Sequence, residues 1–228
     1  MDLLIEVETP LLWDVETYIE GLANLESFPT IVLAENGGVS AIAIGEALKG
    51  KTDKEVFIKI TCRDRNRIAL HSDLLTAAAK GLTNVVLAEG GHPVQTRFPA
   101  AKPVYELDSL LLLKMMRQAN PSFGKDLVVA LGSLPWKIAV CIGGATAADM
   151  SRAEKLHAAG ADLFFVASLE AVKPVRRLTD KPIFVSMYAE NVSNLGEMLS
   201  TVESSGAQGM NLVLKALDKV IDGSIIRK

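Results

Sequence analysis

The chain has 228 residues, enough for one large hydrophobic core, and its 24 basic and 27 acidic residues give a formal net charge of −3. This near balance, without a polybasic run, argues against a surface that binds nucleic acid or anionic lipid. The longest apolar runs, such as LLLLKMM at residues 110–116, are too short to span a bilayer, so no membrane partner is expected.

The cysteine content and the N-terminus both predict a cytoplasmic protein. Cys62 and Cys141 form neither a CxxC pair nor a disulfide framework. The opening residues, MDLLIEVETP, include acidic side chains where a signal peptide carries basic ones. No His, Cys and Asp residues have the spacing of a metal site, so no bound metal is predicted.

Short apolar segments alternate with helical patterns along the whole chain. Strands are expected at Leu3–Glu8, Thr30–Glu35, Glu55–Cys62, Asn84–Glu89, Lys137–Gly143, Leu163–Ser168, Pro182–Tyr188 and Met210–Lys215. Helices are expected at Trp13–Leu25, Ser40–Leu48, Arg67–Lys80, Ser109–Gln118, Ala147–Ala159, Ala171–Leu178, Asn194–Ser204 and Ala216–Ile221.

Eight strands, each followed by a helix, predict an α/β protein with one domain over residues 1–228, a single (β/α)8 TIM barrel. The alternative is an open, doubly wound sheet of eight strands. A GxGxxG motif after the first strand would favour that alternative, and the sequence has none there.

Alternation along the strands predicts which side chains face the barrel interior. In the first strand Leu3, Ile5 and Val7 form an apolar face for helices to cover, which leaves the other face inside. The inward side chains are then Leu4, Glu6 and Glu8 in the first strand, Phe57, Lys59 and Thr61 in the third, Ser186 and Tyr188 in the seventh, and Asn211, Val213 and Lys215 in the eighth.

Charges at these inward positions need an explanation, because an unpaired buried carboxylate or ammonium group is energetically expensive. One explanation is a structural ion pair between Lys59 and either Glu6 or Glu8. The other is a proton donor held in a desolvated pocket with a raised pKa. The spacing alone leaves both explanations open.

Glycine pairs follow three of the expected strands: Gly37–Gly38 after Asn36, Gly90–Gly91 after Glu89, and Gly143–Gly144. Glycine lets the backbone approach a planar ring or a phosphate closely, so we expect a ligand among these loops. The other interpretation is that strand-to-helix turns favour glycine in general. If the ligand interpretation holds, valine at Gly90 or Gly91 should block binding and leave the fold intact.

Four segments of the chain carry a family resemblance. They are IEVETP at residues 5–10, the run from TCRDRN to NVVLAEGGHP within residues 61–93, VYELDSLLLL at residues 104–113, and AGADLFFVAS at residues 159–168. Together they resemble the methylenetetrahydrofolate reductase family. The resemblance implies a TIM-barrel flavoprotein of one-carbon and methionine metabolism. Such a protein uses FAD to reduce 5,10-methylenetetrahydrofolate, or a related pterin, to the 5-methyl form.

The resemblance also assigns site residues. It makes Glu6 the general acid that protonates a folate nitrogen, with Glu8 and Lys59 adjusting its pKa. The expected cofactor-binding residues are Asn36, Thr61, Glu89, Gly90, Gly91 and Asp149, the last at a flavin-contacting aspartate of the family. The expected partners are a folate or related pterin, an electron donor that is either NAD(P)H or a protein, and further copies of the chain in a homo-oligomer.

The chain departs from the family pattern at three places. Gly91 stands where the family has an aspartate near flavin and pterin, Val166–Ala167 replace a threonine-glutamine pair, and Lys59 replaces a histidine. FMN, or no flavin, therefore stays open beside FAD. The alternative functions are a flavin-free pterin-binding protein of methyl transfer and a non-catalytic subunit of a reductase complex. Retention of Glu6 argues against the non-catalytic subunit.

Overall fold

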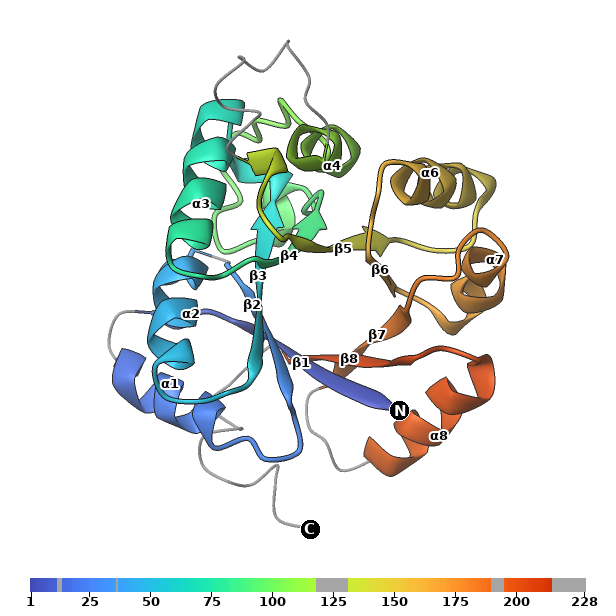
Figure 1. Ribbon diagram of the computed structural model, residues 1–228, viewed down its shortest axis with the longest axis horizontal. Helices are drawn as coiled ribbons and strands as arrows, with labels where there is room; N and C mark the ends of the chain where they lie inside the picture. Colours follow the sequence, from blue (N-terminus) through green and yellow to red (C-terminus); the bar gives the residue numbers. More distant parts are fainter. Residues whose placement is uncertain (12–13, 36, 118–130, 190–194, 215–228) are drawn as a thin grey trace.

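The computed structural model describes residues 1–11, 14–35, 37–117, 131–189 and 195–214. Within these ranges eight parallel strands close into a barrel in chain order, β1 to β8 (Figure 1). The predicted TIM barrel is confirmed. The open-sheet alternative is wrong, because β1 pairs with β8 from Asp2–Gly209 to Val7–Leu214.

The strands begin and end within two residues of the predicted positions. They are β1 (Asp2–Glu8), β2 (Thr30–Ala34), β3 (Glu55–Thr61), β4 (Asn84–Ala88), β5 (Lys137–Ile142), β6 (Leu163–Val166), β7 (Ile183–Ala189) and β8 (Gly209–Leu214). Lys215, predicted to face inward at the end of the eighth strand, lies outside the described residues.

Helices surround the barrel and cover the outer face of its strands (Figure 1). They are α1 (Val15–Ala23), α2 (Ala41–Lys49), α3 (Arg67–Ala79), α4 (Ser109–Arg117), α6 (Ala147–Ala158), α7 (Val172–Arg176) and α8 (Leu195–Ser205). In the described part of the chain no helix has the length and apolarity needed to cross a membrane. The helix predicted at Ala216–Ile221 lies outside the described residues.

The helix α7 is shorter than predicted. The segment expected as Ala171–Leu178 is a 3-10 turn at Leu169–Ala171 followed by the short α7. Pro174 is the third residue of α7, and proline is tolerated in the first turn of a helix but not in its interior. The proline therefore favours a helix that begins close to it, at Val172.

The core has an inner and an outer layer, and these confirm the predicted strand faces. The outer layer lies between strands and helices and contains Ile5, Val7, Ile58 and Ile60. The inner layer fills the barrel with Leu4, Val32, Phe57, Val86, Ala139, Leu163, Phe165 and Phe184. Leu4 and Phe57 precede Glu6 and Lys59 by two residues on the same strands, so the apolar inner layer lies beneath these two charged side chains.

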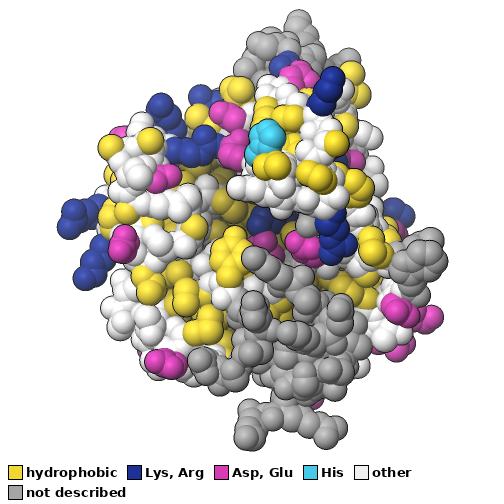
Figure 2. Space-filling model, turned by 180° about the vertical axis from the view of Figure 1, so that it is seen from behind, with side chains coloured by type: hydrophobic (Ala, Val, Ile, Leu, Met, Phe, Trp, Pro, Cys, Tyr) yellow, Lys and Arg dark blue, Asp and Glu magenta, His cyan; other side chains and the backbone are white. Residues whose placement is uncertain are grey.

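The described surface mixes charges of both signs. On the face shown in Figure 2, acidic and basic side chains lie near one another, with apolar side chains between them. This mixture agrees with the small net charge of −3.

The closure of the barrel depends on Gly209. A Cβ atom at this position would lie 2.1 Å from the carbonyl oxygen of Asp2 and 2.8 Å from Phe184 Cε1. Gly209→Ala should therefore push β1 and β8 apart and lower the free energy of unfolding by about 1–3 kcal/mol, as overpacking does. Urea unfolding measures this loss.

Gly196, in α8, provides the control, because a Cβ atom there would meet no heavy atom within 4 Å. Gly196→Ala should leave the free energy of unfolding unchanged or raise it, since alanine favours helix over glycine. Equal stability of the two variants would contradict the predicted clash at Gly209.

Candidate active site

A cavity of about 680 Å³ opens at the C-terminal ends of the barrel strands. Its volume suits a small organic ligand, and its position is where TIM barrels bind their ligands. Eight of the nine predicted site residues line it: Glu6, Glu8, Lys59, Thr61, Glu89, Gly90, Gly91 and Asp149. The ninth, Asn36, lies outside the described residues.

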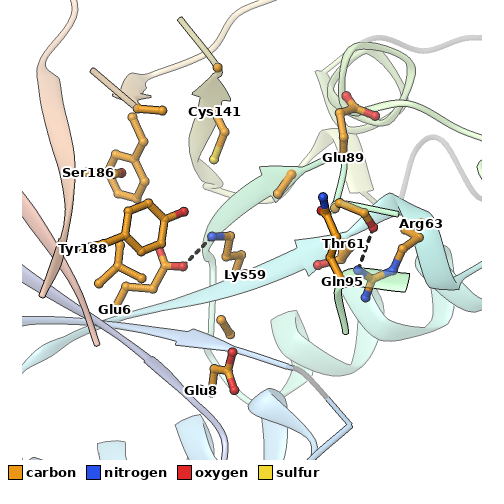
Figure 3. A pocket seen from close by; sticks show the side chains of 18 of the residues that line it. Glu6, Glu8, Lys59, Thr61, Arg63, Glu89, Gln95, Cys141, Ser186 and Tyr188 are labelled. Atoms are coloured by element: carbon orange, nitrogen blue, oxygen red, sulfur yellow. Dashed lines mark hydrogen bonds and ion pairs between the residues drawn. The ribbon is translucent and has the colours of Figure 1, made fainter. Parts of the chain in front are cut away.

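The floor of the cavity holds a buried ion pair. Lys59 Nζ lies 2.5 Å from Glu6 Oε1, and the two side chains point toward each other in Figure 3. On its other oxygen Glu6 accepts a hydrogen bond of 2.9 Å from Asn211 Nδ2, which also lies 3.3 Å from Ser186 Oγ. Glu6 is 5% exposed and Asn211 is fully buried. Strands β1, β3, β7 and β8 thus contribute one polar side chain each to a single cluster.

The cluster keeps Lys59 protonated. Burial by itself would lower the pKa of Lys59, but the carboxylate of Glu6 opposes this, and the net effect raises the pKa above its usual value. Both contacts of Glu6, an ammonium group and an amide N–H, stabilise a carboxylate. The contact between Lys59 and Glu6 is therefore an ion pair.

Cys141 also lines the cavity, from β5, and it is not among the predicted site residues. Burial raises the pKa of its thiol to about 11, with Lys59 lowering it and Glu6 raising it by smaller amounts. The group is therefore a neutral thiol at ordinary pH. The alternation rule applied to the fifth strand would have placed it inside.

The glycine turn after β4 is held by two side chains. Tyr105 Oη donates to the carbonyl oxygen of Gly90 at 3.0 Å, and Arg63 Nη1 donates to that of Gly91 at 2.9 Å. Gly90 has a φ of +81°, and a Cβ atom there would lie 2.4 Å from Thr61 Cγ2. The expectation that valine at Gly90 leaves the fold intact is therefore wrong, because that residue must be glycine for the turn itself.

Glu89 and Asp149 line the cavity and also hold the loops together. Glu89 forms an ion pair with Arg152 and accepts a hydrogen bond of 2.9 Å from the backbone N–H of Ser109, where α4 begins. Asp149 forms a capping box with Thr146 at the start of α6. The geometry thus gives both carboxylates a structural role beside the predicted binding role.

The arginines of the TCRDRN motif also form ion pairs with carboxylates. Arg63 forms an ion pair with Asp64 at 2.6 Å, and Arg65 pairs with Glu35 and with Asp73. At the mouth of the cavity Glu8 pairs with Arg97, with 3.3 Å between Oε2 and Nη2. The motif therefore shapes the rim of the cavity.

A planar ring system fits the cavity by volume and by the glycine backbone along its wall. Its described lining contains three cations, Lys59, Arg63 and Arg152, and each is paired with a carboxylate. The phosphates of a flavin would therefore have to compete with a carboxylate for one of these cations, or bind groups outside the described residues. Among the described residues no group of three or more His, Cys, Asp or Glu side chains is placed to hold a metal ion.

No protein-family model and no curated protein matches the chain. A mutant tryptophan synthase alpha-subunit from Pyrococcus furiosus is similar in structure, with 12% identity, a TM-score of 0.63, and coverage of 97% of this chain and 90% of that one. The YdjI aldolase from Escherichia coli K12 has 12% identity and a TM-score of 0.51, covering 95% and 76%.

A FabK mutant from Thermotoga maritima has 13% identity and a TM-score of 0.51 over 92% of this chain. The chain spans 60% of the length of that FabK protein. At these identities the likeness to all three structures shows the TIM-barrel fold alone.

The ion pair on the floor predicts a stability effect. Lys59→Met removes the cation and leaves the Glu6 carboxylate buried without it, which costs about 3–5 kcal/mol of unfolding free energy for a fully buried pair. The 22% exposure of the Lys59 side chain places the loss at the lower end. Adding Glu6→Gln should give a smaller loss than the sum of the two single variants, because no charge is then left unpaired.

The control is Lys51→Met, which removes an exposed lysine paired with Glu20 at 3.2 Å and should change stability by less than about 1 kcal/mol. Urea unfolding of the wild type, Lys59→Met, Glu6→Gln and the double variant gives the double-mutant cycle, and Lys51→Met is measured beside it. Strictly additive losses at Glu6 and Lys59 would show that the two side chains are not coupled.

Proposed function

We propose that the protein is an enzyme that reduces 5,10-methylenetetrahydrofolate, or a related methylene-pterin, to the 5-methyl form. The observation that carries this proposal is the Glu6 carboxylate, which lies on the floor of a ligand-sized cavity with Lys59 and Asn211 bound to it. The same residue lies in IEVETP, where the chain resembles methylenetetrahydrofolate reductases. Geometry and resemblance therefore support the same acid.

The Glu6–Lys59 pair holds one transferable proton. The Glu6 carboxylate favours the ammonium form of Lys59, against the effect of burial. A ligand that covers the pair buries it further and so favours two neutral groups, since charged groups lose more on desolvation. The proton then lies on Glu6, from which it passes to a ligand nitrogen placed above it.

Protonation of that nitrogen opens the methylene bridge. The C–N bond breaks and its electron pair stays with the protonated nitrogen, while the lone pair of the other bridging nitrogen forms the C=N bond of an iminium ion. A flavin held along the wall of Thr61, Gly90 and Gly91 would supply the hydride for this carbon. Asn211 keeps the Glu6 carboxyl group in place through its hydrogen bond.

The remaining predicted residues surround this reaction. Thr61, Gly90, Gly91 and Asp149 line the wall against which the ring systems would lie. The same proposal includes NAD(P)H or a protein as the reductant of the flavin. It also includes a homo-oligomeric assembly. A cytoplasmic location is also part of the proposal, and the free thiols of Cys62 and Cys141 support it.

Glu6→Gln tests the role of the acid. It keeps the size of the side chain and removes its ability to transfer a proton, so turnover with methylenetetrahydrofolate should fall roughly 10²–10⁴-fold. Reduction of bound flavin by its electron donor should be nearly unchanged, because that half-reaction does not protonate the folate. Steady-state turnover and stopped-flow flavin reduction on one preparation measure the two effects.

Glu55→Gln is the matched control. Glu55 pairs with Lys137 at 2.7 Å where β3 and β5 begin, at the opposite end of the barrel. This change should leave turnover at the wild-type level. A stable Glu6→Gln protein with wild-type turnover would refute the proposed role of Glu6.

The second candidate is a flavin-free protein that binds a methylated pterin for methyl transfer. The pairing of all three cations in the described lining favours it, as does Gly91. If the reductase proposal holds, the purified protein should be yellow, or should take up FAD or FMN stoichiometrically when reconstituted. A colourless protein that binds 5-methyltetrahydrofolate but cannot be reconstituted with either flavin would establish the second candidate instead.

A further inference from the structure

The described lining of the cavity offers a ligand mostly neutral groups. Every charged side chain in this lining has a partner within the protein, an ion-pair partner in all cases but Asp149, which binds Thr146. The amide of Gln95 is different: no other described side chain or backbone group hydrogen-bonds to it. It lies in the lining with both its donor and its acceptor available.

The backbone under Gln95 is well fixed. Gln95 ends a 3-10 turn, Pro93–Gln95, in which its own N–H donates to the carbonyl oxygen of His92 at 2.9 Å. His92 Nδ1 accepts from the N–H of Val94 at 3.3 Å, and Thr96 Oγ1 donates to the carbonyl oxygen of Pro93 at 2.7 Å. The turn therefore presents the Gln95 side chain from a defined position.

The side chain of Gln95 lies across Gly91. A Cβ atom at Gly91 would be only 2.6 Å from Gln95 Oε1, while one at the preceding Gly90 would be 2.4 Å from Thr61 Cγ2. Gln95 and Thr61 thus pack on consecutive glycines, and Figure 3 places them together on one wall of the cavity. The absence of a side chain at Gly91 is what makes room for the amide.

The Gln95 amide on this wall suits one kind of hydrogen-bonding edge on a ligand ring. An amide presents one donor and one acceptor side by side, which pairs with a ring N–H next to a ring carbonyl. Amide side chains read such edges in bidentate fashion elsewhere, as with adenine in nucleic acids. A carboxylate at the same place would only accept, and would need two adjacent donors.

We propose that Gln95 determines ligand specificity by pairing its amide with the lactam edge of an uncharged heterocycle. The rest of the ligand extends from this wall toward Glu6 and Lys59. The inference rests on the proposed function, since pterins carry such an edge, and it adds the residue that reads the ring.

The test compares two fluorescent probes, pterin and lumazine, by titration of their dissociation constants. Both have lactam edges, so the wild type should bind both. Pterin also has two adjacent donors, its 2-amino group and ring N–H, whereas lumazine has a carbonyl in place of the amino group. Gln95→Glu should therefore raise the ratio of the lumazine to the pterin dissociation constant roughly 10- to 100-fold. Gln95→Ala should weaken both probes roughly tenfold and leave the ratio near its wild-type value.

Gly91→Ala is an independent route to the same effect. Its Cβ atom would meet only the far end of the Gln95 side chain, so it should displace the amide and leave the turn intact. It should weaken both probes as Gln95→Ala does, and the double variant should bind no worse than either single one. Additive losses would mean that Gly91 and Gln95 act separately.

The control for charge is Val94→Glu. Val94 neighbours Gln95 on the same turn, is 63% exposed, and lies outside the cavity lining. This variant should leave the ratio of the two dissociation constants unchanged. An unchanged ratio in Gln95→Glu, or an equal rise in Val94→Glu, overturns the role of Gln95 and leaves the proposed function standing. Failure of the wild type to bind either probe overturns both.

Discussion

The ion pair between Glu6 and Lys59 is the constraint on which the site depends. β1 and β3 are not neighbours, since β2 lies between them, so the pair connects strands across the barrel interior. An apolar layer below it excludes water, and Asn211 satisfies the second carboxylate oxygen from β8. A charged group can stay inside the barrel only with such partners. The pair thereby sets the floor of the cavity and the point at which chemistry can occur.

The loops above this floor use charge for a different purpose. Arg65 joins Glu35, Arg97 joins Glu8, and Arg152 joins Glu89, so each pair links the loop after one strand to another element. The charged side chains of these loops are therefore paired with one another and are not free to bind a charged ligand. Recognition is left to neutral groups on a fixed backbone, which is a better match to an uncharged ring than to a phosphate.

Local periodicity explains what the sequence predicts well. A two-residue repeat sorts Glu6, Lys59 and Thr61 to the interior regardless of the rest of the chain, and the barrel follows from the count of alternating elements. The loop pairs have no such signal, because Glu89 and Arg152 are 63 residues apart and Glu8 and Arg97 are 89 apart. Gln95 was not predicted as a site residue for the same reason. Gln95 enters the cavity lining by packing on Gly91. A glycine in the sequence gives no indication of which side chain packs on it.

The Glu6–Lys59 pair is more buried than a second glutamate-lysine pair, Glu55–Lys137, and this difference indicates whether Glu6–Lys59 has only a structural role. Glu55 and Lys137 pair where their strands begin, with side chains 36% and 46% exposed, so water reduces the cost of their charges. The side chains of Glu6 and Lys59 are 7% and 22% exposed, and a buried pair of this kind adds little stability compared with apolar side chains of the same size. The inner layer just below is filled with such apolar side chains. Stability alone therefore gives no reason for a charged pair at the floor of the cavity, whereas a reaction that needs a proton there does.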